Sequence, residues 1–234
     1  MVFKQKEFNE FAREKKVAGY YARPIELSSG RISHVYYNWR DVSNDIFDLE
    51  TLSRHVLNFV DDRNLSPDCF FGVPEGATKL AFMTNYLWAN RSLATLENYV
   101  LPMGRGKVKL HGEPKDRYFI GEPRGNTIIL EDVTTTGSSL LEWIANLREL
   151  NGVNVIAAIS LTNRMELTPI SGKDEQKIID AFAITYERAT GKSYDQAMSV
   201  KEAISHTGIP FYWVSTGQEL LANINIPKNI VREI

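Results

Sequence analysis

The chain has 234 residues, of which 43% are hydrophobic and 24% are charged, and its formal net charge is −2 at pH 7. These values are typical of a globular protein and exclude a general electrostatic affinity for nucleic acid or membrane surfaces. The single cysteine, Cys69, excludes an intrachain disulfide, and no apolar run approaches the roughly 18 residues of a membrane span. We therefore expect one domain in the cytoplasm.

The first 40 residues predict a small region outside the main sheet. Residues 3–18 have the apolar spacing of a short amphipathic helix. The turn Ser28-Ser29-Gly30 then separates two β-prone pieces, at about 25–27 and 34–38. Two such pieces around a turn predict a hairpin.

The rest of the chain alternates between short apolar runs and helical patterns. We expect strands at residues 69–73, 94–101, 127–130, 153–160 and 211–214. Helices are expected at about 46–62, 76–90, 137–150, 199–206 and 217–223. This alternation predicts the α/β fold class, with a mostly parallel sheet that helices cover on both faces.

Two segments interrupt the alternation. Residues 103–125 are rich in Gly, Lys and Arg and poor in large apolar side chains, which predicts a long mobile loop that acts as a lid or binding loop. Residues 165–198 are polar apart from one helical stretch at about 174–188, and we interpret them as an insertion rather than as part of the core.

The stretch from Ile128 to Leu140 carries the clearest chemical signal. Three apolar residues predict a buried strand, two acids follow, and a turn rich in threonine, serine and glycine opens a helix. In an open α/β sheet, ligands bind at the carboxyl ends of strands. Backbone N–H groups at the positive end of a helix bind phosphate, and Gly137 allows the backbone to approach it closely.

The two acids, Glu131 and Asp132, need a different ligand, because carboxylates repel a phosphate. Vicinal sugar hydroxyls fit this role, as does a magnesium ion held through water. Together with the turn, they predict a site for a ribose 5-phosphate. The alternative is an ordinary helix N-cap, Thr135 or Thr136, beside two solvated acids. No Gly-Lys-Ser/Thr follows the glycine, which excludes a Walker motif.

The stretch resembles the phosphoribosyl pyrophosphate signature of the type I phosphoribosyltransferases, in which two acids and Thr-Thr-Gly lead into small hydroxyl residues. Thr134 departs from the usual aliphatic residue. Further matches, over about residues 8–164, resemble the orotate branch of this family. They are Ser29-Gly30-Arg31 with Tyr36-Tyr37-Asn38, the loop Phe71–Ala77, the basic loop Arg105–Gly112, and Asn163-Arg164.

The resemblance implies transfer of ribose 5-phosphate from phosphoribosyl pyrophosphate to orotate, with Mg²⁺ held through substrate and water. It implies Lys109 as the main catalytic lysine, Arg105 and His111 as pyrophosphate ligands, and Asp132 as a further catalytic group. It also implies an N-terminal hood over the base, and a homodimer in which the basic loop reaches the neighbouring site. The expected substrate-binding residues are Glu131, Asp132, Thr135, Thr136, Gly137, Ser138, Ser139, Lys107, Glu75, Gly76, Tyr36, Tyr37 and Arg164.

Several positions depart from the branch. Ser28 and Gly106 stand where lysines are usual, and Glu75-Gly76 replaces a lysine of the first pyrophosphate loop. Three alternatives therefore stay open: transfer to another base, a regulator that binds phosphoribosyl pyrophosphate with weak activity, and a basic loop that is only a solvated surface. Likewise, the tyrosine pair fits either a base pocket or the core, and Arg164 fits either a carboxylate ligand or a surface arginine.

Overall fold

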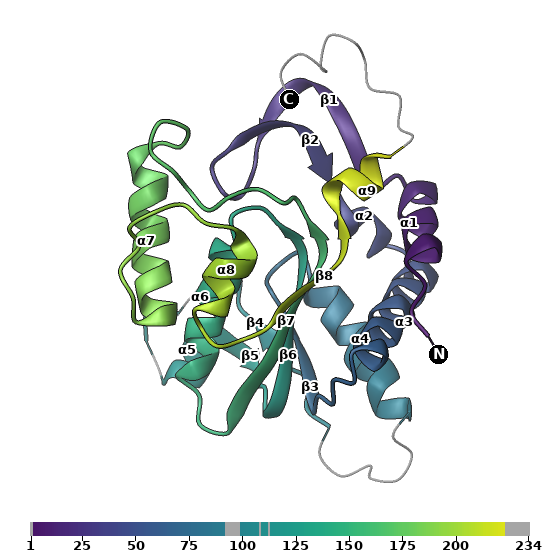
Figure 1. Cartoon of the computed structure of the whole chain (residues 1–234). Coiled ribbons are helices and arrows are strands. Elements are labelled where there is room, and N and C mark those ends of the chain that lie inside the picture. Colours follow the sequence, from purple (N-terminus) through teal and green to yellow (C-terminus); the bar gives the residue numbers. More distant parts are fainter. Residues whose placement is uncertain (1, 92–98, 108, 112, 223–234) are drawn as a thin grey trace.

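A parallel four-stranded sheet forms the centre of the fold (Figure 1). The computed structural model describes residues 2–91, 99–107, 109–111 and 113–222. The strand order is β3-β6-β7-β8, with bounds Cys69–Gly72, Gly125–Thr134, Val153–Asn163 and Phe211–Thr216. The predicted α/β class and four of the five predicted strands are confirmed, because every neighbouring pair in this sheet is parallel.

Helices cover both faces of this sheet (Figure 1). One face carries α3 (Ile46–Asp62) and α4 (Thr78–Arg91), and the other carries α6 (Ser138–Arg148), α7 (Gln176–Thr190) and α8 (Val200–Ser205). The sequence predicted all five, with ends within two or three residues. A short α9 (Gly217–Leu221) follows the last strand.

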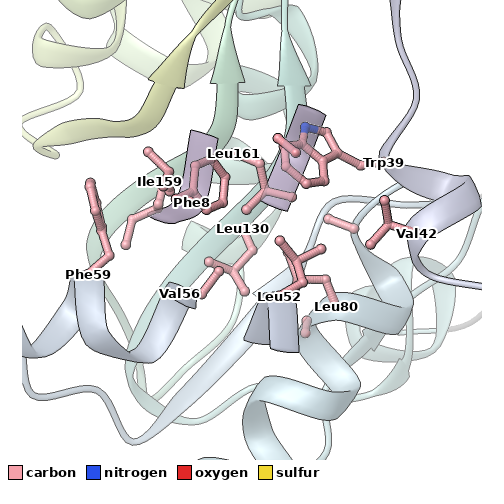
Figure 2. Packing of buried hydrophobic residues seen from close by; sticks show 14 of the residues in the cluster. Phe8, Trp39, Val42, Leu52, Val56, Phe59, Leu80, Leu130, Ile159 and Leu161 are labelled. Atoms are coloured by element: carbon pink, nitrogen blue, oxygen red, sulfur yellow. The ribbon is translucent and has the colours of Figure 1, made fainter. Parts of the chain in front are cut away.

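Two apolar clusters, one on each face of the sheet, hold the helices to it. Successive residues of a strand belong to different clusters. In β6, Ile128 and Leu130 belong to the first cluster and Ile129 to the second. Side chains of a strand alternate between faces, so an unbroken apolar run fills both cores. Figure 2 shows the first cluster, where Leu130 and Ile159 of the sheet meet Leu52 and Val56 of α3.

The predicted N-terminal hairpin is confirmed. It consists of β1 (Ala18–Glu26) and β2 (Ile32–Tyr37), which pair antiparallel outside the main sheet. The first strand begins earlier than the sequence indicated, and its register shifts between Tyr20 and Ile25. Helices α1 (Gln5–Glu14) and α2 (Trp39–Val42) flank the hairpin, and the indole of Trp39 donates to Thr162 Oγ1 of β7 at 2.9 Å.

Two of the expected irregular or extended segments differ in the structure. Of the strand expected at 94–101, residues 94–98 lie outside the described residues, and residues 99–101 are not in a strand. Within the loop expected at 103–125, β4 (Met103–Gly104) and β5 (Phe119–Gly121) pair antiparallel around α5 (Pro114–Tyr118). The cause is Phe119, which is 3% exposed and packs against Phe71 and Trp143.

The segment 165–198 contributes to the core, contrary to our interpretation. Phe182, Tyr186 and Ala189 of α7 are buried in the second cluster. The ring of Tyr194 packs edge-on against Phe182, with centroids 4.8 Å apart. These residues were overlooked because the charged residues between them give the segment a polar average. Among the described residues, no helix is long and apolar enough to cross a membrane.

An ion-pair network fixes the hairpin to this same segment. Arg31 donates from Nε and Nη2 to the two carboxylate oxygens of Asp174, at 2.6 and 2.8 Å, and from Nη1 to Glu166 at 2.7 Å. The side chains of Arg31 and Asp174 are 7% and 1% exposed. The hydrogen bonds from Arg31 hold the pKa of Asp174 below its usual value.

We predict that Asp174→Asn lowers the free energy of unfolding by about 3 kcal/mol, because Arg31 then keeps a buried charge with one carboxylate partner fewer. Urea denaturation measures this. Asp61→Asn is the matched control, since Asp61 pairs with Arg91 where both side chains are about a third exposed, and it should cost less than about 1 kcal/mol. Equal losses in the two variants would contradict a buried clamp.

Candidate active site

The turn between β6 and α6 has the geometry of an anion site. Gly137 precedes the helix with a left-handed backbone, φ 83°, and no side chain caps the helix N-terminus. The first N–H groups of a helix have no partner within it, so those of α6 are available to a ligand. The hydroxyls of Thr136 and Ser138 lie 3.0 Å apart and could bind the same ligand.

The turn encloses a cavity of about 30 Å³. Its lining residues are Ser28, Ser29, Glu131, Val133, Thr135, Thr136, Gly137, Ser138 and Ser139. Seven of these lie in the stretch that the sequence singled out, and Glu131 is among them. The structure therefore brings the first acid and the hydroxyl-rich turn together, and adds two serines from the hairpin. Strand β6 continues to Thr134, so both acids belong to the strand rather than following it.

Glu131 is buried beside this cavity, with 5% of the residue exposed. The Thr134 hydroxyl donates to its carboxylate. Burial raises the pKa of Glu131 to about 8, against the lowering effect of the Thr134 hydrogen bond, and the nearby charge of Asp132 raises it further. Without a positively charged or hydrogen-bonding ligand, Glu131 is therefore largely protonated at neutral pH.

Asp132 faces a different part of the site, the loop Phe71–Ala77. A Cβ atom at Gly76 would lie 2.2 Å from Asp132 Oδ2, so the glycine is what allows the carboxylate to sit against the loop backbone. Burial raises the pKa of Asp132, and the positive charge of Arg40 opposes that rise. Sequence reasoning missed Arg40, which follows the hairpin in α2 and belongs to no motif.

The loop Phe71–Ala77 also meets the basic loop Arg105–Gly112. A Cβ atom at Gly106 would lie 2.4 Å from Glu75 Oε1, and one at Gly104 would lie 2.6 Å from Pro74 Cγ. Glu75 and Gly106 are two of the positions that depart from the orotate branch, and here they are in contact. A side chain at position 106 would have to displace Glu75. Glu75 is exposed and its carboxylate ends a flexible side chain, so it can move aside.

The cationic residues of the basic loop are placed differently from one another. Arg105 is half-buried and bound to the nearby backbone. Its backbone N–H donates to Tyr118 O at 2.7 Å, and its Nε donates to the carbonyls of Asp116 and Phe119. Lys107, Lys109 and His111 are exposed. Val108 and Gly112 of this loop lie outside the described residues.

The residues expected to bind the base are largely engaged with the protein itself. Tyr37 is 6% exposed and packs in the first core cluster, whereas Tyr36 is half-buried and packs edge-on against Tyr21. Arg164 donates from Nε to Glu166 at 2.6 Å, from Nη1 to the Val35 carbonyl at 3.0 Å, and from Nη2 to Ser33 Oγ at 2.9 Å.

Arg164 and Glu166 open onto a larger pocket, of about 680 Å³, between the hairpin and the segment that begins at residue 165. Its lining combines basic and acidic side chains, including Arg31, Lys173, Asp174 and Glu175. The size is within the range of small-molecule sites. A ligand carboxylate that is to reach Arg164 has to compete with Glu166 there.

No preformed metal centre is present in the part of the chain that the structure describes, since no three His, Cys, Asp or Glu side chains are grouped to hold an ion. The chemistry of Glu131 and Asp132 nevertheless suits a hard cation held through water, because two buried acids with raised pKa values gain stability from a nearby positive charge.

Comparisons with known proteins find similar sequences and similar folds. No protein-family model matches the chain. It is 28% identical over 163 residues to the orotate phosphoribosyltransferase of Polynucleobacter asymbioticus, covering 69% of each chain. Among solved structures, it is similar to orotate phosphoribosyltransferase from Aeropyrum pernix, with a TM-score of 0.59 and 22% identity over 92% of this chain and 96% of that one.

A third similar structure is that of the Mycobacterium tuberculosis orotate phosphoribosyltransferase in complex with 5-phospho-α-D-ribosyl 1-diphosphate. Its TM-score is 0.54 at 17% identity, over 92% of this chain and 98% of that chain. The fold is therefore that of the type I phosphoribosyltransferases, as predicted. Sequence similarity adds that the chain resembles orotate phosphoribosyltransferases, at 26–28% identity.

We predict that Glu131→Gln changes the pH dependence of stability. The unfolded Glu131 loses its proton near pH 4.5, whereas the folded one keeps it to about pH 8, so wild-type stability falls across this window by up to about 1.4 kcal/mol per pH unit. The amide cannot ionise and still accepts from Thr134. Melting temperatures from pH 4 to 9 should match at the acid end, and the variant should be the more stable above pH 8.

Glu142→Gln, at an exposed glutamate of α6, controls for the loss of one charge. A difference between Glu131→Gln and wild type that does not vary with pH would show that burial does not hold the proton on Glu131.

Proposed function

We propose that the chain transfers ribose 5-phosphate from phosphoribosyl pyrophosphate to orotate, giving orotidine 5′-phosphate and pyrophosphate. The observation that carries this proposal is the cavity in which the β6–α6 turn and Glu131 face one another. Similarity to orotate phosphoribosyltransferases supports the choice of base. The cytoplasmic location stays a prediction.

In this proposal, different residues bind the phosphate, the ribose and the pyrophosphate of the substrate. The turn from Thr135 to Ser139 binds the 5-phosphate through backbone N–H groups and hydroxyls. Glu131 and Asp132 accept hydrogen bonds from the ribose hydroxyls or from water on Mg²⁺. The magnesium ion, held through substrate and water, would neutralise charge on the pyrophosphate.

The transfer breaks the bond from C1 of ribose to pyrophosphate and forms one from C1 to a nitrogen of the base, which gives up its proton. Negative charge grows on the leaving pyrophosphate while the sugar becomes cation-like. Arg105, Lys107, Lys109 and His111 form the cationic loop that meets this charge. The first pyrophosphate loop, at Glu75 and Gly76, borders the same region, because it contacts both Gly106 and Asp132.

We predict that Lys109→Ala lowers kcat about 10²-fold and leaves the affinity for phosphoribosyl pyrophosphate nearly unchanged, because the lysine acts on charge that develops during the reaction. Steady-state kinetics and calorimetry measure the two quantities. Lys6→Ala, at an exposed lysine of α1, is the control and should leave both unchanged. An unchanged kcat in Lys109→Ala would remove the catalytic assignment, and a wild-type protein that binds but does not turn over any base would favour the regulator.

A second candidate is a phosphoribosyltransferase for another base, and the pairing of Arg164 with Glu166 favours it. Incubation with labelled phosphoribosyl pyrophosphate, Mg²⁺ and a panel of pyrimidines and purines separates the two.

We predict that orotate is turned over in this assay. Arg164→Gln should raise the KM for orotate at least tenfold, because the orotate carboxylate then loses its arginine partner. Turnover of another base with orotate inert would contradict the proposal.

We further propose that the protein acts as a homodimer in which the basic loop completes the neighbouring site. Exposed apolar side chains on α3 and α4 support it: Phe47 is 74% exposed, Tyr86 is 60% exposed, and Ile46 and Phe82 line a shared groove. Met103, in β4 two residues before the basic loop, lines that groove as well. A partner seated there would lie beside the root of the loop.

Mixing two inactive variants tests this arrangement. Lys109→Ala lacks the loop lysine, and Asp132→Asn lacks the acid of the β6 site. If loops act across an interface, hybrid dimers regain up to about a quarter of wild-type activity, because one of their sites holds neither substitution and half of the dimers are hybrids. Sedimentation velocity gives the oligomeric state in the same samples. A monomer, or a mixture without recovered activity although hybrids form, would contradict the shared site.

A further inference from the structure

The turn of the N-terminal hairpin carries an unexplained buried hydroxyl. Ser29 Oγ is inaccessible to solvent and has no hydrogen-bond partner among the described residues. An unpaired buried hydroxyl costs about 1–3 kcal/mol, so a native structure retains one where a ligand, an ion or water supplies the partner.

Its surroundings indicate which partner. Ser29 lines the cavity of about 30 Å³ that the β6–α6 turn encloses, together with Thr135, Thr136 and Gly137. In the described part of the chain, two other side chains have unpaired buried atoms, Ser53 and Asn58, and both lie within α3. The cavity is large enough for a water-sized group such as a phosphate oxygen. Apart from Ser28, every other hydroxyl that lines the cavity comes from the β6–α6 turn.

The hairpin turn is held in place from two sides, so the position of Ser29 is not accidental. The backbone closes through Leu27 N–H to Arg31 O and Gly30 N–H to Leu27 O, both at 2.8 Å. A Cβ atom at Gly30, which has φ 80°, would lie 2.7 Å from Ile178 Cδ1 of α7. Directly after the turn, Arg31 is clamped by Asp174.

We infer that Ser29 is a ligand of the 5-phosphate, its hydroxyl donating to a phosphate oxygen that the β6–α6 turn holds from the other side. The inference rests on the proposed function and deepens it. The hairpin, which the family resemblance links to the base, then also encloses the sugar-phosphate end. The segment 165–198 acts on that end indirectly, since Arg31 and Ile178 position the hairpin turn.

Calorimetry with ribose 5-phosphate tests the inference. We expect Ser29→Ala to weaken binding about tenfold, the loss of one hydrogen bond to a charged group. Ser53→Ala is the matched control, because it removes another unpaired buried hydroxyl that lines no part of the cavity, and its affinity should equal that of wild type. The melting temperature of Ser29→Ala should not fall, since the hydroxyl has no partner within the described protein.

Two further measurements separate a phosphate ligand from a shifted hairpin. Inorganic phosphate should lose affinity in Ser29→Ala by a similar factor, and the KM for the base should stay within about twofold of wild type. Unchanged ribose 5-phosphate affinity in Ser29→Ala would overturn the inference and leave the proposed function intact. A wild-type protein that binds neither ribose 5-phosphate nor phosphoribosyl pyrophosphate would instead overturn the proposed function.

Discussion

The backbone conformation at Gly137 is the constraint on which the site depends. With φ at 83°, Gly137 lets the chain enter α6 three residues after β6 ends, and Gly137, Ser138 and Ser139 line the cavity at the start of the helix. A side chain at this position would be strained by the left-handed conformation, and its Cβ would lie 2.8 Å from Val200 of α8. The close packing of α8 and the conformation of the β6–α6 turn therefore both require a glycine at position 137.

This arrangement also explains why the acids tolerate their burial. Glu131 and Asp132 occupy adjacent positions of β6, so their side chains face opposite sides. Glu131 faces the β6–α6 turn, and Asp132 faces Gly76. Both have raised pKa values, which costs stability in the free protein. A bound sugar with two hydroxyls, or a hydrated cation, would offset that cost.

The sequence predicted the parts of this structure that local pattern determines. The apolar runs that became β3, β6, β7 and β8 and the helical spacings beside them needed no tertiary information, and the stretch 128–140 identified the turn directly. Contacts between distant segments were not predictable in the same way. Three such relations join residues that no spacing rule connects. Arg40 acts on Asp132, Ser29 lines the cavity of the β6–α6 turn, and Glu75 lies against Gly106. Phe119 and Phe182 were missed because each lies in a longer segment whose average composition is polar.

Amide chemical shifts during a titration with ribose 5-phosphate test the central claim most directly. If the β6–α6 turn binds the terminal phosphate, the backbone N–H signals of Thr136, Gly137, Ser138 and Ser139 move most, and downfield, as expected for donors to an anion. Saturable binding that leaves these four signals in place while others move would contradict the account.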